Sequence, residues 1–282
     1  MEGKETWTTL KILTWTKEYL AGKGVDNARL EAEWLLCEAL ALDRIGLYLN
    51  FDKPLQDNEL AVYRTMVARR AKREPLQYIL GSQEFYGLEF VVTPAVLIPR
   101  HDTELLVEEA LKRAVPEGRI LDIGAGSGCI AVALAAKLPA AEIYGVEQSA
   151  VALAVAAENA QRNGVRLHLL AGSLFEPVSG EMFDLIVSNP PYIPSGDLPG
   201  LEPEVRDYEP LAALDGGVDG LDFYRLIIPA AVDQLSPGGW LLVEVGINQA
   251  IAVRELFASS GFSAIFAAKD PGGVDRVVGG KI

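Results

Sequence analysis

From Glu104 onwards, short continuous runs of Ile, Leu and Val alternate with segments of helical periodicity. Strands that read as unbroken apolar runs are typical of a sheet covered on both faces. Their alternation with helices predicts an open α/β sheet with crossover helices, and ligands of such sheets bind beyond the carboxyl ends of the strands. The expected strands and helices are, in chain order, Arg119–Ile123, Ile130–Lys137, Glu142–Val146, Ala150–Arg162, Arg166–Leu170, Phe183–Ser188, Leu221–Leu235, Trp240–Val245 and Ala250–Ser259.

The first hundred residues predict a helical segment followed by a hairpin-like connector. Up to about residue 73 the pattern is helical, and within residues 28–41 apolar side chains recur at three- and four-residue steps. The recurring residues are Leu30, Trp34, Cys37 and Ala41. The core of a small bundle is expected to contain Trp7, Trp15 and Trp34. Between about Leu76 and Arg100, two short β-rich runs flank Gly87, which predicts the connector.

The net charge of −14, from 25 basic and 39 acidic residues, limits the partners of the chain. It argues against a protein that gains its affinity by neutralising nucleic-acid phosphates. The densest basic cluster is interpreted as a solvated helix face rather than as a binding surface. It comprises Arg64, Arg69, Arg70, Lys72 and Arg73.

The two cysteines and two histidines offer no recognisable ligand set. Cys37 and Cys129 are too few and too far apart for a disulfide framework, and no Cys/His spacing resembles a metal site. His101 and His168 are expected to be exposed or structural. No stretch is long and apolar enough to span a bilayer, and no signal peptide is recognisable. We therefore expect a soluble, cytoplasmic protein without a metal.

The apolar run Phe183–Ser188 ends in Asn189-Pro190-Pro191-Tyr192, which predicts a binding site for a planar NH2 group. Both prolines fix φ and lack an N–H, so local carbonyls are free to accept hydrogen bonds. Asn189 precedes a proline and is biased to extended geometry, which turns its side chain out of the strand end. The Asn189 side-chain oxygen and the Pro190 carbonyl would accept the two N–H bonds, while Tyr192 packs against their plane. A plain Pro-Pro turn is the alternative, and the motif alone does not separate a glutamine amide from an adenine amine.

Residues Ile120–Ala131 read as a strand, a glycine-rich turn and the start of a helix. Glycines are needed where the backbone bends tightly and approaches a ligand. The next strand ends at Glu147, 19 residues after Gly128, where a carboxylate can accept from ribose hydroxyls or simply cap the following helix. The pattern G-x-G-x-x-G/A is formally satisfied, which leaves a nicotinamide or flavin dinucleotide open. The denser pattern G-x-G-x-G, formed by Gly124, Gly126 and Gly128, is typical of S-adenosylmethionine-dependent methyltransferases.

In this order, the motifs resemble those of the peptide chain release factor glutamine methyltransferases, and the similarity covers most of the chain. The segments that carry it are Glu74–Gly81, Glu84–Leu88, Leu97–Arg100, Leu121–Ala131, Asn189–Ile193, Glu209–Leu214 and Asp219–Asp222. The stretch from Glu74 to Leu88 is the most specific, because other amino methyltransferases share the N-P-P-Y sequence without it.

The resemblance implies an α/β class I S-adenosylmethionine-dependent methyltransferase with a Rossmann-like, seven-stranded sheet. It implies a helical substrate-recognition domain over residues 1–74, a β-hairpin linker over 75–100 and a catalytic domain over 101–282. The implied cofactor contacts are Gly124, Ala125, Gly126, Ser127 and Gly128 at the methionine part, Glu147 at the ribose, Leu174 at the adenine, and Asn189. The implied contacts of the acceptor glutamine are Asn189, Pro190, Pro191 and Tyr192.

The implied reaction transfers a methyl group to the glutamine amide of the Gly-Gly-Gln sequence in class 1 release factors, which modulates translation termination. No metal, membrane or direct nucleic-acid contact is expected. One alternative is an adenine-N6 methyltransferase of DNA or RNA, against which the lack of a clear basic stripe argues. A second alternative is a non-catalytic protein-binding module, against which the glycine turn, Glu147 and Asn189 argue together.

Three features depart from the family pattern. His101 and Asp102 stand where the family usually has Pro-Glu before Thr-Glu. The ribose acid is more often Asp than Glu147, and Ser173 stands where an Asp is common. These departures are expected to affect cofactor affinity and the entry loop, and to leave the acceptor site unchanged.

Overall fold

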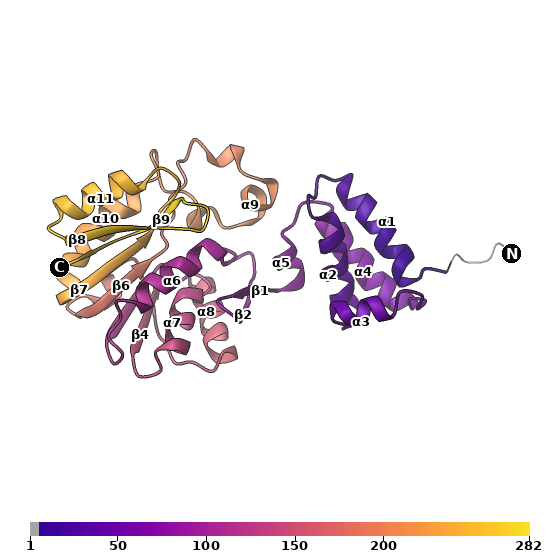
Figure 1. Cartoon of the computed structure of the whole chain (residues 1–282), viewed down its shortest axis with the longest axis horizontal. Helices are drawn as coiled ribbons and strands as arrows, with labels where there is room; N and C mark the ends of the chain where they lie inside the picture. Colours follow the sequence, from indigo (N-terminus) through magenta and orange to yellow (C-terminus); the bar gives the residue numbers. More distant parts are fainter. Residues whose placement is uncertain (1–5) are drawn as a thin grey trace. The chain divides into compact units, whose positions relative to one another are not determined.

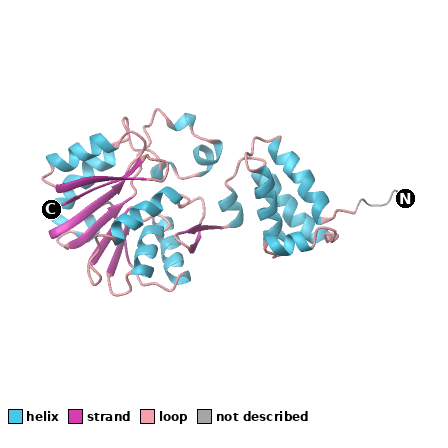
Figure 2. Ribbon diagram, in the orientation of Figure 1, coloured by secondary structure: helices cyan, strands magenta, loops and turns pink. Residues whose placement is uncertain are grey.

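The computed structural model describes residues 6–282, which form two compact units. Among the described residues, one unit comprises 6–81 together with Glu202–Tyr208, and the other comprises Ser82–Leu201 together with Glu209–Ile282. Figure 2 shows that the first unit is helical and that the second is built around a sheet.

The first unit is a bundle of short and medium-length helices (Figure 1). They are α1 (Thr9–Ala21), α2 (Ala28–Leu40), α3 (Arg44–Leu49), α4 (Asp57–Arg70), α5 (Leu76–Leu80) and α9 (Pro203–Tyr208). Local polar residues start some of them; the Asp43 carboxylate, for example, accepts from the Gly46 amide at 2.6 Å and caps α3. Leu20, Leu35 and Leu36 are among the side chains that fill the core.

Two of the three tryptophans lie at the bundle surface, so the prediction that they fill its core was wrong for those two. Trp15 is 46% exposed and stacks on Tyr19, with ring centroids 4.9 Å apart. Trp34 is 39% exposed. Trp7 is partly buried against the core and meets Trp15 edge to face.

Helix α2 buries a different face from the one that its apolar spacing indicated. The buried residues are Ala28, Ala32, Glu33, Leu35 and Leu36. Glu33 can be buried because Arg29, Arg44 and the Tyr48 hydroxyl all donate to its carboxylate. A search for apolar periodicity cannot find a face that contains a buried, hydrogen-bonded acid.

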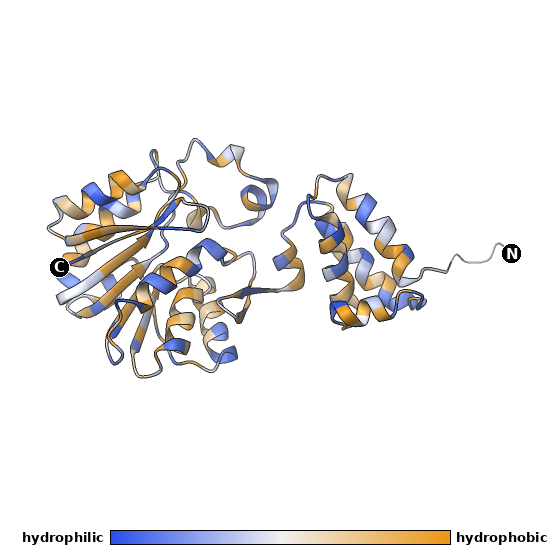
Figure 3. Ribbon diagram, in the orientation of Figure 1, coloured by the Kyte–Doolittle hydropathy of each residue, from blue (hydrophilic) through white to orange (hydrophobic). Residues whose placement is uncertain are grey.

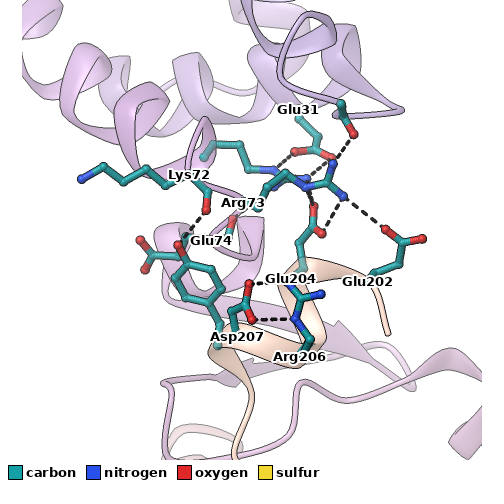
Figure 4. Close-up of polar contacts among 11 residues, drawn as sticks. Glu31, Lys72, Arg73, Glu74, Glu202, Glu204, Arg206 and Asp207 are labelled. Carbon is teal, nitrogen blue, oxygen red and sulfur yellow. Dashed lines mark hydrogen bonds and ion pairs between the residues drawn. The ribbon is translucent and has the colours of Figure 1, made fainter. Parts of the chain in front are cut away.

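Helix α9 belongs to the helical unit although its sequence lies within residues 101–282, which were assigned to the catalytic domain. Its Glu204 faces arginines of the bundle (Figure 4). The Glu204 Oε1 atom lies 2.9 Å from a guanidinium nitrogen of Arg70 and 2.7 Å from one of Arg73. Arg70 also pairs with Glu31 and is only 5% exposed.

The basic cluster is therefore not a solvated helix face throughout, and that interpretation was wrong for three of its members. Arg70 and Arg73 bind Glu204, and Arg69 binds Glu74 at 2.5 Å. Arg64 and Lys72 are exposed, as expected.

The second unit contains a seven-stranded sheet in the order β5-β4-β3-β6-β7-β9-β8. The strands are β3 (Arg119–Ile123), β4 (Glu142–Glu147), β5 (His168–Ala171), β6 (Phe183–Ser188), β7 (Leu235–Glu244), β8 (Ser263–Lys269) and β9 (Asp275–Lys281). The first five in spatial order are mutually parallel, and β9 runs antiparallel to both β7 and β8. The α/β fold with seven strands is confirmed, although β8 and β9 lie outside the elements expected from the pattern.

Helices cover both faces of this sheet (Figure 1). On one face lie α6 (Glu104–Leu111), α7 (Cys129–Lys137) and α8 (Ala150–Arg162); on the other lie α10 (Asp222–Ala231) and α11 (Ala250–Ser259). Figure 3 shows the strands as predominantly hydrophobic, which agrees with burial on both sides. Because helices cover both faces of the sheet, we expect the polar side chains of a binding site at the ends of the strands.

A β-hairpin precedes the sheet and packs with it. It consists of β1 (Ser82–Phe85) and β2 (Leu88–Val91), joined by Tyr86 and Gly87 with φ of +53° and +73°. Positive φ at both central residues is the geometry that suits a two-residue hairpin. Phe85 and Phe90 enter the core beneath α6 and α7. The Asn159 side chain bonds both the N–H and the carbonyl of Val91, which satisfies the edge of the hairpin.

Candidate active site

The strand order reverses between β3 and β6, and both predicted motifs lie at this point. The glycine loop, Gly124–Gly128, follows β3, and the proline turn, Asn189–Tyr192, follows β6. Ile123 at the end of β3 pairs in register with Ser188 at the end of β6, and Ser188 Oγ donates to the Ile123 carbonyl at 2.8 Å. The two motifs therefore leave neighbouring strand ends, where open α/β sheets bind their ligands.

The glycine loop requires glycine for two different reasons. Gly128 has φ of +78°, which strains any other residue, and a Cβ there would lie 3.1 Å from the Cβ of Ala156, a tight contact with α8. Gly124 has φ of +74°, but a Cβ there would meet no described heavy atom within 4 Å. The backbone at Gly124 thus borders open space at the strand ends, as a ligand-binding loop would.

Glu147 joins the end of β4 to the glycine loop. Its Oε2 accepts from the Gly126 amide at 2.9 Å, and its Oε1 accepts from the Ser149 amide at 2.8 Å. The second bond resembles the helix-cap interpretation, because Ser149 is the N-cap of α8. Each carboxylate oxygen can accept another hydrogen bond, so Glu147 retains the capacity to bind two hydroxyl groups.

Leu174 follows the neighbouring strand, β5. Ala171, the last residue of β5, pairs in register with Glu147, and the Gly172 amide donates to the Glu147 carbonyl at 3.1 Å. Leu174 is half-buried and has φ of +48°, which is uncommon for a residue with a side chain. The structure therefore places Leu174 and Ser173 beyond the strand next to Glu147.

Asp122 is a buried acid of β3 that the sequence patterns did not single out. Its Oδ2 accepts from the Ala131 amide at 3.2 Å, while its Oδ1 has no hydrogen-bond partner among the described residues. Burial raises the pKa of Asp122 to about 7; the Ala131 amide opposes this shift, and the charge of Glu147 adds to it. An acid inside an apolar strand, two residues before the glycine loop, was the available signal.

Two hydrogen-bond acceptors of the proline turn have no partner among the described residues. Asn189 Nδ2 donates to the Thr103 hydroxyl oxygen at 3.1 Å, so the Oδ1 end of the amide is directed elsewhere. Within residues 6–282, neither Asn189 Oδ1 nor the Pro190 carbonyl accepts a hydrogen bond. Both groups can therefore accept from another molecule.

Thr103 comes from the segment that departs from the family pattern, but it is not one of the departing residues. Thr103 is buried just before α6, whereas His101 and Asp102 are exposed. His101 pairs with Glu104, and Asp102 pairs with Arg276 at 2.9 Å. The departures at 101 and 102 thus lie at the surface, while Thr103 reaches Asn189.

A loop before α10 and the Gln249 side chain hold the proline turn in place. Gln249 Nε2 donates to the Tyr192 carbonyl at 2.8 Å and to the Gly220 carbonyl at 3.2 Å. Gly220 has φ of +74°, and a Cβ there would lie 2.3 Å from the Tyr192 carbonyl oxygen, so this position admits only glycine.

Glu209 accepts from Arg100 at 2.5 Å, which joins two segments of the family resemblance.

Tyr192 and Thr103 share a buried acid at the end of β7. The Tyr192 hydroxyl donates to Glu244 Oε1 at 3.3 Å, and Glu244 is 1% exposed. Burial is the largest cause that raises the pKa of Glu244, to about 7, and hydrogen bonds from Thr103 and Tyr192 act in the opposite direction. Thr103, Glu244 and Gln249 contact the proline turn or its polar side chains, and the sequence patterns did not single them out.

Two further observations concern the described residues as a set. Within residues 6–282, no group of three His, Cys, Asp or Glu side chains is placed to hold a metal ion. In the same range, no helix combines the length and the apolar character that crossing a bilayer requires.

Two family models match separate parts of the chain, and solved structures resemble its fold. The model of the PrmC N-terminal domain matches residues 11–81, and that of the methyltransferase small domain matches residues 100–198. A methyltransferase from Pyrococcus furiosus has a TM-score of 0.54 at 19% identity, covering 70% of this chain and 90% of that chain. The hMettl16 catalytic domain, solved with MAT2A 3′UTR hairpin 6, has a TM-score of 0.55 at 18% identity, covering 76% and 81%. These structural similarities concern the fold.

Bacterial proteins named release factor glutamine methyltransferase match over nearly the whole sequence. The Geobacter sulfurreducens protein is 66% identical over 281 residues, covering 100% of this chain and 99% of that protein. The Moorella thermoacetica protein is 47% identical over 246 residues, covering 86% and 87%. The Agrobacterium fabrum protein is 41% identical over 286 residues, covering 99% of each. The chain belongs to the release factor glutamine methyltransferase family.

Proposed function

We propose that this protein transfers a methyl group from S-adenosylmethionine to the side-chain amide nitrogen of the glutamine in the Gly-Gly-Gln sequence of class 1 peptide chain release factors. The names of its relatives support the substrate class. The observation that carries the proposal is the pair of acceptors, Asn189 Oδ1 and the Pro190 carbonyl. Both are free of described partners and lie beside the glycine loop.

The features of the glycine loop fit this cofactor, which supplies an electrophilic methyl group on a sulfonium sulfur when bound. The open space beside Gly124 and the remaining acceptor capacity of Glu147 support the fit. In the proposed assignment, Glu147 accepts from the ribose hydroxyls and Leu174 packs against the adenine. The residues proposed to line the methionine part are Gly124, Ala125, Gly126, Ser127 and Gly128, with Asn189 next to the methyl group.

The acceptor nitrogen needs alignment more than it needs a base. An amide nitrogen is a poor nucleophile because its lone pair is delocalised into the carbonyl. In the proposed mechanism, Asn189 Oδ1 and the Pro190 carbonyl accept its two N–H bonds, while Tyr192 packs against the amide plane and Pro191 keeps the turn rigid. Because the nitrogen is held in line with the methyl group, the transfer becomes an effectively unimolecular step within the complex. The two acceptors would also stabilise the positive charge that develops on nitrogen. The nitrogen–methyl bond would form as the methyl–sulfur bond breaks, which leaves S-adenosylhomocysteine, and the methylated nitrogen would then lose its proton to water.

The rest of the chain is proposed to select a protein partner. Residues 1–74 would recognise the release factor, residues 75–100 would link the two functions, and the protein would work in the cytoplasm with its substrate. The net charge of −14 supports a protein rather than a nucleic acid as the partner.

The proposal predicts that Asn189→Ala lowers turnover by about 100-fold or more, because the substrate amide loses a fixed acceptor. Cofactor affinity should change little. The measurement is incubation of the protein with a class 1 release factor and labelled S-adenosylmethionine, followed by location of the methyl group by peptide mass spectrometry.

Asn163→Ala is the matched control, because the Asn163 side chain donates only to the backbone carbonyls of Glu89 and Asn159. It should retain activity. A parallel reaction with duplex DNA separates the proposal from adenine methylation. Label on DNA but not on glutamine, or equal loss of cofactor binding and activity in Asn189→Ala, would contradict the assigned role.

A further inference from the structure

Glu244 connects the two polar side chains of the proline turn. Strands β6 and β7 are parallel and Ser188 pairs with Val243, so Asn189, just after β6, lies next to Glu244, the last residue of β7. Asn189 Nδ2 lies 3.1 Å from Thr103 Oγ1, and the Thr103 side chain lies close enough to the Glu244 carboxyl to lower its pKa. The Tyr192 hydroxyl lies 3.3 Å from Glu244 Oε1. Thr103 and Glu244 are 2% and 1% exposed, so this chain of contacts is shielded from solvent.

The position of one proton in this chain determines which way the Asn189 amide points. An ionised carboxylate only accepts hydrogen bonds, so Thr103 can interact with Glu244 only by directing its hydroxyl hydrogen towards the carboxylate. The Thr103 oxygen is then left with lone pairs alone, which can accept from Asn189 Nδ2 but cannot donate to Asn189 Oδ1. The charge of Glu244 thus determines the orientation of an amide that it does not touch.

We propose that Glu244 and Thr103 are positioning residues for methyl transfer, which together hold Asn189 with its Oδ1 towards the substrate amide. This inference rests on the proposed function, because it assumes that Asn189 Oδ1 accepts a substrate N–H. If the Asn189 amide turned over, its N–H would meet the N–H of the substrate, and two donors repel. The acceptor nitrogen would then lose its alignment with the methyl group.

The half-satisfied state of Glu244 supports a role beyond stability. Its Oε2 atom has no hydrogen-bond partner among the described residues. A buried carboxylate with an unpartnered oxygen destabilises a fold, and an apolar residue would avoid that cost. The orientation of Asn189 gives a reason for a charged group at this place.

The charged and titratable groups around Glu244 make a pH test possible. The pKa of Glu244 is raised to about 7, mainly by burial; the charge of Asp102 contributes to the rise and that of Arg276 opposes it. Tyr224 donates to the Glu244 backbone carbonyl, and Cys129 lies within electrostatic range. Below about pH 7 the Glu244 carboxyl gains a proton and can donate to Thr103, which releases the constraint on Asn189. The kcat of the wild type should therefore fall as the pH decreases through about 7.

The experiment compares three variants of the full-length protein with the wild type. Glu244→Gln places a donor where the structure has only acceptors, Thr103→Val removes the hydroxyl, and Thr103→Ser keeps it. We measure kcat and KM for a release factor, the Kd for S-adenosylmethionine by calorimetry, and the thermal unfolding midpoint. Glu244→Gln and Thr103→Val should lower kcat by roughly 10- to 100-fold with little change in cofactor Kd. Thr103→Ser should restore most of kcat, and Glu244→Gln should lose the acidic limb of the pH profile.

Retention of wild-type kcat by Thr103→Val, or equal losses in Thr103→Val and Thr103→Ser, would overturn the inference. If Glu244→Gln does not fold, the Thr103 pair decides alone. These results differ from a failure of the proposed function, in which the wild type itself would leave glutamine unmethylated.

Discussion

Asp122 and Glu244 are acids held inside an apolar sheet, and each has one carboxylate oxygen without a described partner. The two lie at the ends of β3 and β7, on either side of β6 and its proline turn. Burial penalises the ionised form of both, so their pKa values rise to about 7. Perturbed pKa values of this kind are concentrated at functional sites.

Asp122→Asn is expected to change the pH dependence of stability. The folded-state pKa of Asp122 is raised, so its contribution is fully present below the unfolded pKa, near 3.8, and is lost as the pH rises through about 7. The asparagine side chain does not ionise, so the variant does not lose stability in this way as the pH rises. Its unfolding midpoint relative to the wild type should therefore increase between pH 5 and pH 8, as measured by differential scanning calorimetry.

Asp233→Asn serves as the control, because Asp233 is exposed and its substitution removes the same formal charge. Its difference from the wild type should stay constant over that pH range. A constant difference for Asp122→Asn as well would show that Asp122 does not titrate in the folded protein as its burial indicates.

At the residue scale, the sequence predicted the groups that lie beside a strong local signal. Gly124 and Asn189 follow strand ends, Glu147 is the last residue of β4, and their neighbours in sequence predict roles for them. Thr103 and Glu244 could not be found in this way. Glu244 is brought to the site by the register between β6 and β7, and Thr103 by the position of the residues just before α6. Neither the register nor that position can be derived from a single sequence.

Helix α9 is held by an ion pair that is largely removed from solvent. Burial opposes ionisation of Glu204, but hydrogen bonds from Arg73 and Arg70 outweigh it, and the pKa of Glu204 is lowered. Glu204→Gln should lower the free energy of unfolding by about 1–3 kcal/mol, because it leaves two arginines short of an acceptor. The measurement is urea unfolding followed by far-ultraviolet circular dichroism.

Glu202→Gln is the matched control on the same segment. The Glu202 side chain is 78% exposed and lies 3.3 Å from Arg73, and an exposed pair of this kind contributes at most about 1 kcal/mol. Because the pKa of Glu204 is lowered, its stabilisation is present above the ordinary glutamate pKa and is lost as the pH falls through the folded-state value. Equal effects of the two substitutions at pH 7 would contradict the importance of burial at Glu204.

At the element scale, prediction succeeded for elements with a clear apolar pattern and missed the glycine-containing strand β9. Phe183–Ser188 and Ala250–Ser259 have the bounds that the pattern indicated. Strand β9 contains Gly279 and Gly280, which lower strand propensity. They are accommodated because the rings of Phe266 and Phe257 lie within 2.5 Å and 2.7 Å of the positions where their Cβ atoms would be. That packing reason appears only in the folded protein.

At the scale of the whole molecule, the helical unit is discontinuous in sequence. Its main part ends at Gly81, and Glu202–Tyr208 joins it from a segment that lies between β6 and β7. The composition of Glu202–Tyr208 did not indicate that it joins the helical unit, because an acidic stretch in a long loop is usually solvent-exposed. The partners of Glu204 are arginines more than a hundred residues away, and only the fold brings them together.

A fragment of residues 1–81 should therefore be less stable than the complete helical unit. Without α9, the buried Arg70 retains Glu31 but loses Glu204, and Arg73 loses the acceptor of its closest ion pair. A second fragment with residues 202–208 fused after Gly81 through a flexible Gly-Ser linker should unfold at a higher temperature. A third, with Glu204 replaced by Gln in the fused segment, should lose most of that gain. Calorimetry of the three fragments measures the effect, and identical midpoints would show that α9 adds nothing to the stability of the helical unit.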